Sequence, residues 1–452
     1  MSPQEKRAAA SLAAVYFMRM FGLFLILPVF ALHAETLEGS TVSLAGLAIG
    51  IYGLTQALLQ IPFGMLSDRI GRKPVILGGL VLFAIGSVVA AMADHIVMVI
   101  VGRAIQGSGA IAAAVLALNA DLTLEENRTK AMAMVGMSIG AAFFLSLLLG
   151  PPLASSIGID GIFFLTAAMA VLAMLIVLFI VPTPMNARRH RDAQAIPAEL
   201  GSVLRNPELL RLDAGIFILH AILTALFVAV PLLFRDQLQL ADEEHAKVYL
   251  VVLLLSVAAM IPFVIMAERG GRIKPVFTGA VAALGLALFG MSVAHSGLML
   301  VGFWLFCFFT AFNVLEASLP SLVSKVAPAD RKGTAMGVYS TMQFLGVFVG
   351  GSAGGWFMGQ HGATGVFILI TLLALLWLVI ASGMKPPGRL RSRMVRIGSL
   401  TVDMRERLMD QLLAVPGVEE AVILPDEGVA YLKVNPDSLN EGELSEIFAV
   451  GS

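Results

Sequence analysis

Five ionisable side chains interrupt long apolar stretches of the sequence: Arg19, Arg103, Asp213, His220 and Glu316. Placing a charge in hydrocarbon is expensive, so such residues mark ion or substrate pathways by default. A carboxyl group in apolar surroundings favours its protonated form, and a histidine changes charge near neutral pH. These residue types indicate proton transfer inside a membrane, and the candidates for it are Arg103, Glu316, His220 and Asp213.

Several of these residues have a structural alternative that the sequence leaves open. Arg103 could tie helix ends together as a hydrogen-bond hub, Glu316 could be a neutral, hydrogen-bonded structural group, and His220 could be a satisfied core histidine. Arg19 could face a central cavity or reach back to the membrane interface.

Other polar residues could line a cavity or form hydrogen bonds between helices. They stand three or four residues apart, which places each pair on one helix face. With Arg19, the cavity candidates are Gln56, Gln60, Asn313, Tyr339 and Gln343.

The segment GMLSDRIGRK, residues 64–73, combines an acid, a flexible turn and a basic cluster. Asp68 would lie near a helix end, and Gly71 allows a tight reversal of the chain. The loop could act as a gate, or its charges could only enforce topology. Its basic residues are Arg69, Arg72 and Lys73.

The composition identifies the kind of protein that holds these residues. Of 452 residues, 58% are hydrophobic and 13% charged, whereas soluble domains have about 25% charged residues. The apolar runs of about 20 residues match a hydrocarbon core of about 30 Å. A polytopic membrane protein is expected rather than an enzyme. The sequence contains no G-x-x-x-x-G-K-[ST] phosphate loop, so a primary pump is not expected.

No cofactor, metal site or nucleic-acid partner is expected. The formal net charge is -1 and there is one cysteine, Cys307. That count excludes an intramolecular disulfide or a thiolate metal site, and the charge gives no basic surface for nucleic acid.

Twelve membrane helices are predicted, and the distribution of Lys and Arg orients them. With the amino terminus in the cytoplasm, 23 of these residues lie on the cytoplasmic side and two on the other, as the positive-inside rule requires. The helices are expected at 8–33, 43–66, 74–94, 96–120, 130–152, 161–182, 211–235, 246–267, 275–295, 297–324, 333–358 and 362–384.

The helices divide into two halves that repeat one another. SDRIGRKP at 67–74 recurs as AERGGRIKP at 267–275, and RTKAM at 128–132 echoes RKGTAM at 331–336. Parallel six-helix repeats are a transporter architecture. We expect helix bundles at 1–182 and 211–384, joined by a cytoplasmic linker at 183–210.

The sequence after residue 384 has the composition of a soluble domain. A linker at 385–392 precedes residues 393–452, which contain eleven acidic residues and five Lys or Arg. Alternating and amphipathic patterns predict the order βαββα, with the first strand at 394–398. This α+β domain is expected in the cytoplasm, where it could associate with itself or dock on basic loops.

Residues 64–73 match the G-x-L-S/A-D-R-x-G-R-K loop of the major facilitator superfamily, and the chain resembles that family's drug/proton antiporter branch. RAIQGSGA at 103–110 is similar to the branch's second motif, and the tail resembles a ferredoxin-like domain found in one type of these transporters. The resemblance implies a gating role for Gly64, Asp68, Arg69, Gly71, Arg72, Lys73 and Asp121.

The resemblance also implies specific contacts in the gate. Asp68 would meet the start of helix eleven near residues 332–334, and Arg72 would pair with Asp121, which ends helix four. Together these contacts would hold the cytoplasmic side shut.

The function expected is proton-coupled secondary transport by alternating access, with efflux of amphipathic or drug-like molecules across a bacterial inner membrane. Both termini would be cytoplasmic. The partners would be a small-molecule substrate, protons and the lipid bilayer. Alternatives are a membrane sensor that signals through its tail, or a facilitator that imports a metabolite.

Overall fold

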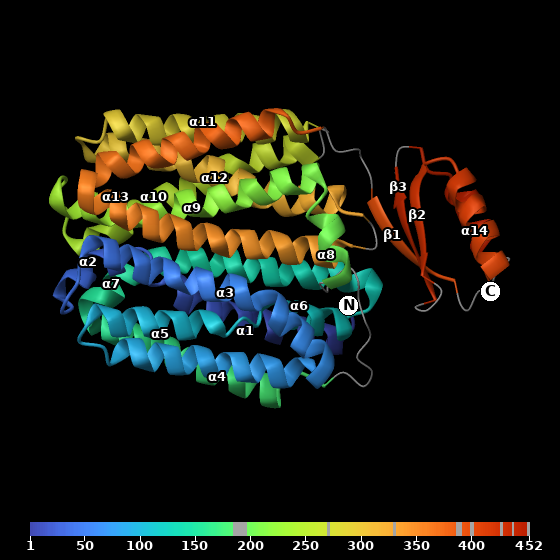
Figure 1. Cartoon of the computed structure of the whole chain (residues 1–452), viewed down its shortest axis with the longest axis horizontal. Coiled ribbons are helices and arrows are strands. Elements are labelled where there is room, and N and C mark those ends of the chain that lie inside the picture. The colour runs from blue at the N-terminus through green and yellow to red at the C-terminus, as the bar shows by residue number, and fades with distance from the viewer. Residues whose placement is uncertain are drawn as a thin grey trace.

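A computed structural model shows a bundle of long helices with a small α+β domain at one end (Figure 1). The chain's amino terminus lies at the same end, which we call the tail side, and the opposite end is the far side. The structure describes residues 1–183, 197–268, 272–328, 331–385, 391–397, 402–424, 428–435 and 438–449.

The N-terminal half of the bundle, residues 1–183, contains seven helices and one 3-10 turn, η1. In order, these are α1 (Pro3–Phe24), α2 (Phe30–His33), η1 (Ala34–Thr36), α3 (Val42–Ile70), α4 (Arg72–Ala91), α5 (Ile96–Ser108), α6 (Ala112–Asp121) and α7 (Glu125–Phe179). The C-terminal half, residues 197–385, contains α8 (Pro197–Val203), α9 (Pro207–Asp236), α10 (Asp242–Glu268), α11 (Ile273–Val293), α12 (Leu298–Val326) and α13 (Lys332–Ser382).

Within the described ranges, nine helical segments are long and apolar enough to cross a membrane, with α5 and α6 counted as one. Two of them, α7 with 55 residues and α13 with 51, are long enough for two crossings each. Each contains a glycine with a positive φ, Gly158 at 70° and Gly362 at 64°, where the helix reverses direction. With α1, these segments accommodate the twelve crossings predicted from the sequence.

Several boundaries differ from those expected. The helix predicted at 96–120 is interrupted between Ser108 and Ala112, and the one predicted at 8–33 ends at Phe24 before a short α2. Helix α9 begins at Pro207, four residues early, because Asn206 accepts hydrogen bonds from the backbone of Glu208 and Leu209 and a proline suits the first helical position.

The two halves meet mainly where α3 packs on α13 and where α7 packs on α10, and glycine allows the closest approach of α3 to α13. A Cβ atom added at Gly46 in α3 would lie 2.3 Å from the Gly351 carbonyl oxygen and 2.6 Å from Gly355 Cα in α13. Helix α9 occupies the centre of the bundle, with 94% of its most apolar stretch buried. A continuous hydrophobic core extends through both halves.

The C-terminal domain has the predicted element order. It contains β1 (Arg391–Arg396), α14 (Val402–Ala414), β2 (Val418–Leu424), β3 (Val429–Val434) and α15 (Glu441–Ala449). The sheet order is β1-β3-β2 with antiparallel pairs, which is the split βαβ arrangement of ferredoxin-like folds. Strand β1 begins three residues before the predicted strand, because Arg391 and Ser392 continue the ladder opposite Val434 and Lys433.

The domain has its own core, which includes Leu412, Ile423 and Leu432. It contacts the bundle where Lys433 Nζ donates a hydrogen bond to the Val326 carbonyl oxygen at 3.5 Å. A lysine at that position faces the negative end of the α12 dipole. Residues 425–427, between β2 and β3, lie outside the described ranges. The basic run at 188–191, on which docking of this domain was expected, also lies outside them.

Candidate functional site

The predicted gate loop lies on the tail side, where α3 ends and α4 begins. Gly71 separates the two helices with φ of 100°, a conformation that strongly favours glycine. Arg72 is 5% exposed and donates to Ser67 Oγ at 2.7 Å and to Asp121 Oδ2 at 3.3 Å. It also bonds Asp68. The expected Arg72–Asp121 contact is therefore present.

The second contact expected of the gate takes a different form. Asp68 and Gly333, in the first turn of α13, line the same cavity of about 70 Å³, but no hydrogen bond joins Asp68 to a described residue of α13. Among the basic residues, Arg69 is exposed, and Lys73 Nζ donates to the Val181 carbonyl oxygen at 2.5 Å. Asp68 thus belongs to the Arg72 cluster and faces α13 across a small space.

Two arginines are buried inside the N-terminal half, each with 1% of its surface exposed. Arg19 donates through Nη2 to Gln56 Oε1 at 2.6 Å and to the Gly109 carbonyl oxygen at 3.0 Å. Gln56 in turn donates to Gln60 Oε1 at 2.7 Å, and Gln60 lines the gate cavity. Arg19 therefore reaches neither the interface nor an open central cavity, because polar groups within its own half bind it.

The interruption between α5 and α6 provides one of those polar groups. Gly109 lies outside both helices, and its carbonyl oxygen accepts from Arg19 as well as from the Ile111 backbone N–H at 2.9 Å. Arg103 in α5 donates to Gln106 Oε1 at 2.8 Å and to the Ala48 carbonyl oxygen at 3.4 Å. Arg103 thus bonds α3 and its own helix, contacts of the kind that the structural alternative to proton coupling, a hydrogen-bond hub, requires.

Tyr52 lies between the two arginines. Its ring centroid is 5.9 Å from Arg19 Cζ and 5.0 Å from Arg103 Cζ, within the range of cation–π attraction. Among the residues that the structure describes, no carboxylate forms an ion pair with either guanidinium. The N-terminal half thus holds two buried cations that carbonyl, amide and aromatic groups stabilise.

The C-terminal half holds acids instead, the buried Asp213 and the partly accessible Glu316. His220 in α9 contacts the Ile216 carbonyl oxygen through Nδ1 at 3.3 Å, while Gln343 of α13 lies 2.8 Å from Nε2. Glu316 of α12 places Oε2 3.9 Å from the same Nε2. When Nδ1 carries the proton, Nε2 accepts from the Gln343 amide, so this geometry fits a neutral imidazole.

Glu316 lies deep along α12, yet 38% of its side chain is accessible. Its Oε2 atom, which faces His220 on the central helix α9, is itself buried and has no hydrogen-bond partner among the described residues. Asn313, one turn earlier, donates to Ser256 Oγ of α10 at 3.3 Å. Glu316 therefore combines a buried carboxylate oxygen with a side chain that is partly accessible.

Asp213 and Tyr339 lie on the tail side of this cluster. Asp213 is 2% exposed, and neither of its carboxylate oxygens has a hydrogen-bond partner among the described residues. Tyr339 is within electrostatic range of both Asp213 and Glu316, and its hydroxyl is also unpartnered. The structure thus brings Asp213, Tyr339, His220, Gln343 and Glu316 into one region, while Gln56 and Gln60 belong to the arginine network.

An aromatic cluster joins the two halves beside Glu316. Phe143 of α7 stacks on Phe312 of α12 with ring centroids 6.4 Å apart, and it contacts Phe227 of α9 at 6.3 Å. Phe24 of α1 meets Phe143 edge-on at 5.3 Å. The cluster thus lies one helical turn from Glu316, and its Phe312 ring also contacts His220, with ring centroids 6.2 Å apart.

On the far side, the halves are joined by an ion pair as well as by glycine packing. Arg235 at the end of α9 donates two hydrogen bonds to Glu35 in η1, at 3.0 and 2.9 Å. The far side is thus closed by contacts between the halves.

Several site residues were not identified from sequence: Ser67, Tyr52, Gln106, Phe143 and Glu35. Gln106 stands within the second motif, three residues after Arg103, and that spacing could have indicated it. The others are common residue types whose role depends on the packing of distant helices.

Comparison with known proteins decides the family. The model of the Major Facilitator Superfamily matches residues 12–351, with a second match over 248–396. The chain belongs to the major facilitator superfamily. It is 44% identical over 453 residues to the inner membrane transport protein YajR of Escherichia coli, covering 99% of this chain and 98% of YajR.

More distant members of the superfamily agree. The multidrug resistance protein MdtH of Aeromonas hydrophila is 26% identical over 339 residues, covering 74% of this chain and 82% of MdtH. The crystal structure of a bacterial homolog of the human lysosomal transporter Spinster, in an inward-facing and occupied conformation, matches with a TM-score of 0.70 at 14% identity, over 85% of this chain and 98% of that one. This superfamily member is a multi-pass membrane transporter, as the sequence predicts, and not an enzyme.

Proposed function

We propose that the protein is a proton-coupled antiporter that exports amphipathic molecules by alternating access. The observation that carries the proposal is the Glu316–His220–Gln343 cluster in the C-terminal half, with Asp213 and Tyr339 beside it. Ionisable groups in membrane helices commonly serve as proton relays. Here they lie on three different helices, α9, α12 and α13, so helix movement would change their separation.

The geometry around His220 supports Glu316 as the proton carrier. While His220 is neutral, no other described residue forms an ion pair with the Glu316 carboxylate, and the removal of Oε2 from water favours the protonated acid. Opening toward the side of lower proton concentration would hydrate Glu316 and release its proton. Asp213 and Tyr339 would then provide polar groups between Glu316 and the tail side.

The aromatic cluster supports an amphipathic substrate. Phe143, Phe227 and Phe312 would offer an adaptable apolar surface, and the deprotonated Glu316 would attract a positive group on the substrate. Proton and substrate would compete for Glu316, which is the simplest basis for antiport. The multidrug names of relatives at about one quarter identity are in keeping with such a substrate.

Alternating access would use the contacts on both sides of the bundle. The far side is held by Arg235–Glu35 and by the contact of Gly46 with α13, while the Arg72 cluster and its cavity would form the gate on the tail side. We place the tail side in the cytoplasm because of the bias in Lys and Arg. The moving units would be residues 1–182 and 211–384, with 183–210 and 385–392 as linkers and 393–452 as the tail domain.

Proteoliposomes that contain a pH-sensitive dye test the function directly. We expect ethidium, an amphipathic cation, to release protons from acid-loaded vesicles containing the protein and not from empty vesicles. Ethidium uptake that ignores the pH gradient would indicate a facilitator. Binding without any movement of ethidium or protons would indicate a sensor.

A further inference from the structure

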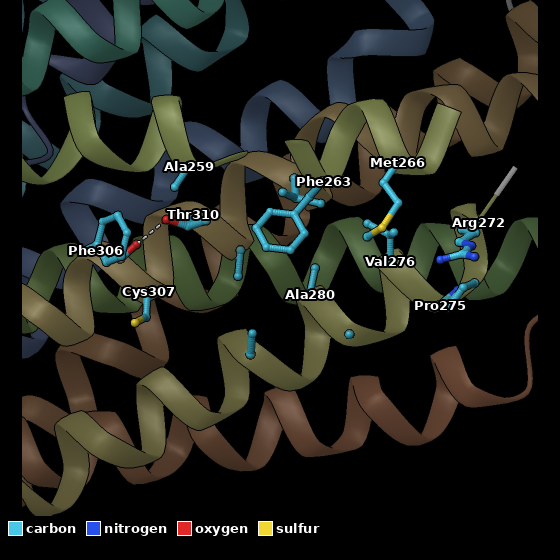
Figure 2. Close-up of a pocket in the computed structure, with 14 residues that line it drawn as sticks. Ala259, Phe263, Met266, Arg272, Pro275, Val276, Ala280, Phe306, Cys307 and Thr310 are labelled. Atoms are coloured by element: carbon cyan, nitrogen blue, oxygen red, sulfur yellow. Dashed lines mark hydrogen bonds between the residues drawn. The ribbon is translucent and has the colours of Figure 1, made fainter. Parts of the chain in front are cut away.

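A groove of about 630 Å³ runs along the C-terminal half between α10, α11 and α12, apart from the residues discussed above. Figure 2 shows Phe306 and Cys307 at one end of the groove, Phe263 and Ala280 along it, and Arg272 at the other end. Arg272 caps the start of α11, so this end lies on the tail side. The volume falls within the range of about 300 to 1,000 Å³ typical of small-ligand pockets.

Small residues create the groove. Gly279, Ala280 and Ala283 of α11 form its floor, and a Cβ atom added at Gly279 would meet nothing within 4 Å. From Pro275 to Ala283 the α11 side of the groove spans nine residues, or about 12 Å along the helix axis. That length approaches the thickness of hydrocarbon in one leaflet, about 15 Å.

The groove opens toward lipid. Helix α10 forms one wall, and only 22% of its most apolar stretch is buried. Phe263 and Met266, which line the groove, are 45% and 38% exposed. In a membrane protein, surface of this kind contacts acyl chains.

The charge of the lining lies at the tail-side end. Among the fourteen lining residues, all from the described part of the chain, Arg272 is the only charged one. Its side chain is exposed and forms no hydrogen bond or ion pair with a described residue. Thr310, deeper in the groove, donates its hydroxyl to the Phe306 carbonyl oxygen at 2.8 Å. The lining is thus apolar over one leaflet's depth and cationic at the headgroup level.

We propose that this groove binds an anionic phospholipid of the tail-side leaflet, with an acyl chain along Gly279 and Ala283 and the phosphate at Arg272. Lys274, two residues later and partly exposed, adds positive charge near this end that favours a headgroup with net negative charge. This site does not depend on the transport proposal, because it lies on the lipid-facing side of α10, α11 and α12.

Native mass spectrometry of the delipidated full chain tests the proposal with phosphatidylglycerol, phosphatidylcholine and inorganic phosphate as probes. We expect the wild type to retain phosphatidylglycerol over phosphatidylcholine. Gly279→Phe should lose one retained phospholipid of either kind. The matched control Gly302→Phe, on α12 outside the groove where an added Cβ also meets nothing, should behave as wild type.

Arg272→Gln should lower the preference for phosphatidylglycerol by about fivefold, the factor that one basic residue contributes near an anionic lipid surface. Cys307, the only cysteine, provides a second readout, because bound lipid should slow its alkylation by N-ethylmaleimide. If Gly279→Phe is not monodisperse, Ala283→Phe fills the same groove.

Three results would overturn the proposal. The filled variants could retain as much lipid as Gly302→Phe, Arg272→Gln could keep the wild-type lipid preference, or inorganic phosphate could displace phosphatidylglycerol and thus show a free-anion site.

Discussion

Arg72 at the start of α4 donates to Asp121 at the end of α6 across 3.3 Å, and both side chains are nearly inaccessible to solvent. The pair ties together two helices of the same half, so it stabilises the position of the gate loop rather than bridging the halves. Removing one partner of a buried pair costs about 3 to 5 kcal/mol, compared with about 1 kcal/mol or less for an exposed pair.

Arg72→Ala should therefore open the tail side and impair transport more strongly than Asp68→Asn, because 29% of the Asp68 side chain is exposed. A cysteine at Ser340, which lines the gate cavity, can report this by maleimide labelling in a Cys307→Ala background. Arg69→Ala, at an exposed position, serves as the control. Unchanged labelling of Ser340→Cys in both variants would exclude a gating role.

On the far side, Gly46→Ala should separate α3 from α13. The added methyl group would lie 2.3 Å from the Gly351 carbonyl oxygen, and backbone on both helices limits relaxation. We expect faster labelling of a cysteine at Ser43 by a membrane-impermeant maleimide, together with lower transport. Gly78→Ala adds the same methyl group to α4 where nothing lies within 4 Å, and it should change neither property. Equal labelling in the two variants would show that the far side is not held at this contact.

Loss of the Arg235–Glu35 ion pair should open the far side less than Gly46→Ala does. The side chains are 32% and 52% exposed, and exposed pairs contribute about 1 kcal/mol or less. Glu35→Gln should shift the far-side equilibrium by about fivefold at most, and the effect should shrink in high salt. If Glu35→Gln opened the far side more than Gly46→Ala, the ion pair rather than the glycine contact would be the stronger hold.

Glu5 makes stability dependent on pH. It accepts a hydrogen bond from the Leu124 backbone at 2.7 Å and also bonds Asn127 and Ser2, which lowers the pKa of Glu5 from 4.5 to about 2. The pKa of Glu5 is lower in the folded protein than in the unfolded chain. The stabilisation of the folded state by ionised Glu5 is therefore complete above pH 4.5 and is lost as the pH falls toward 2.

Glu5→Gln should consequently denature at a lower temperature than wild type at pH 7, and the difference should narrow as the pH falls below 4.5. Thermal denaturation in detergent across this pH range measures the effect, with exposed Glu243→Gln as the control. A constant difference at every pH would remove Glu5 as the cause.

The tail domain should modulate transport without forming the substrate site. Its described contact with the bundle is Lys433 with the end of α12, and the domain carries a separate core. A chain ending near Gly388 should fold, bind substrate and transport at a changed rate, and Lys433→Gln should reproduce part of that change. A monodisperse truncated chain that no longer binds substrate would place the tail in the site.

The sequence predicted the number of helices, the two halves and the gate loop, because apolar runs and basic loops reflect membrane thickness and topology. It did not predict the interruption at Gly109, since glycines are tolerated within membrane helices and the contacts of Gly109 with Arg19 and Gly79 depend on how distant helices pack. The pairing of Glu316 with His220 was also beyond sequence reasoning, because it depends on how α9 and α12 are rotated relative to each other. For the same reason, Tyr52 could not be recognised as the group between two arginines.

Glu316→Gln in proteoliposomes tests the central claim most directly. Glutamine mimics the protonated acid, so the variant should lose ethidium flux driven by a proton gradient while ethidium exchange without a gradient continues. Glu243→Gln, the same change at an exposed position, should retain both. Gradient-driven flux at the wild-type rate in Glu316→Gln would contradict proton coupling through Glu316.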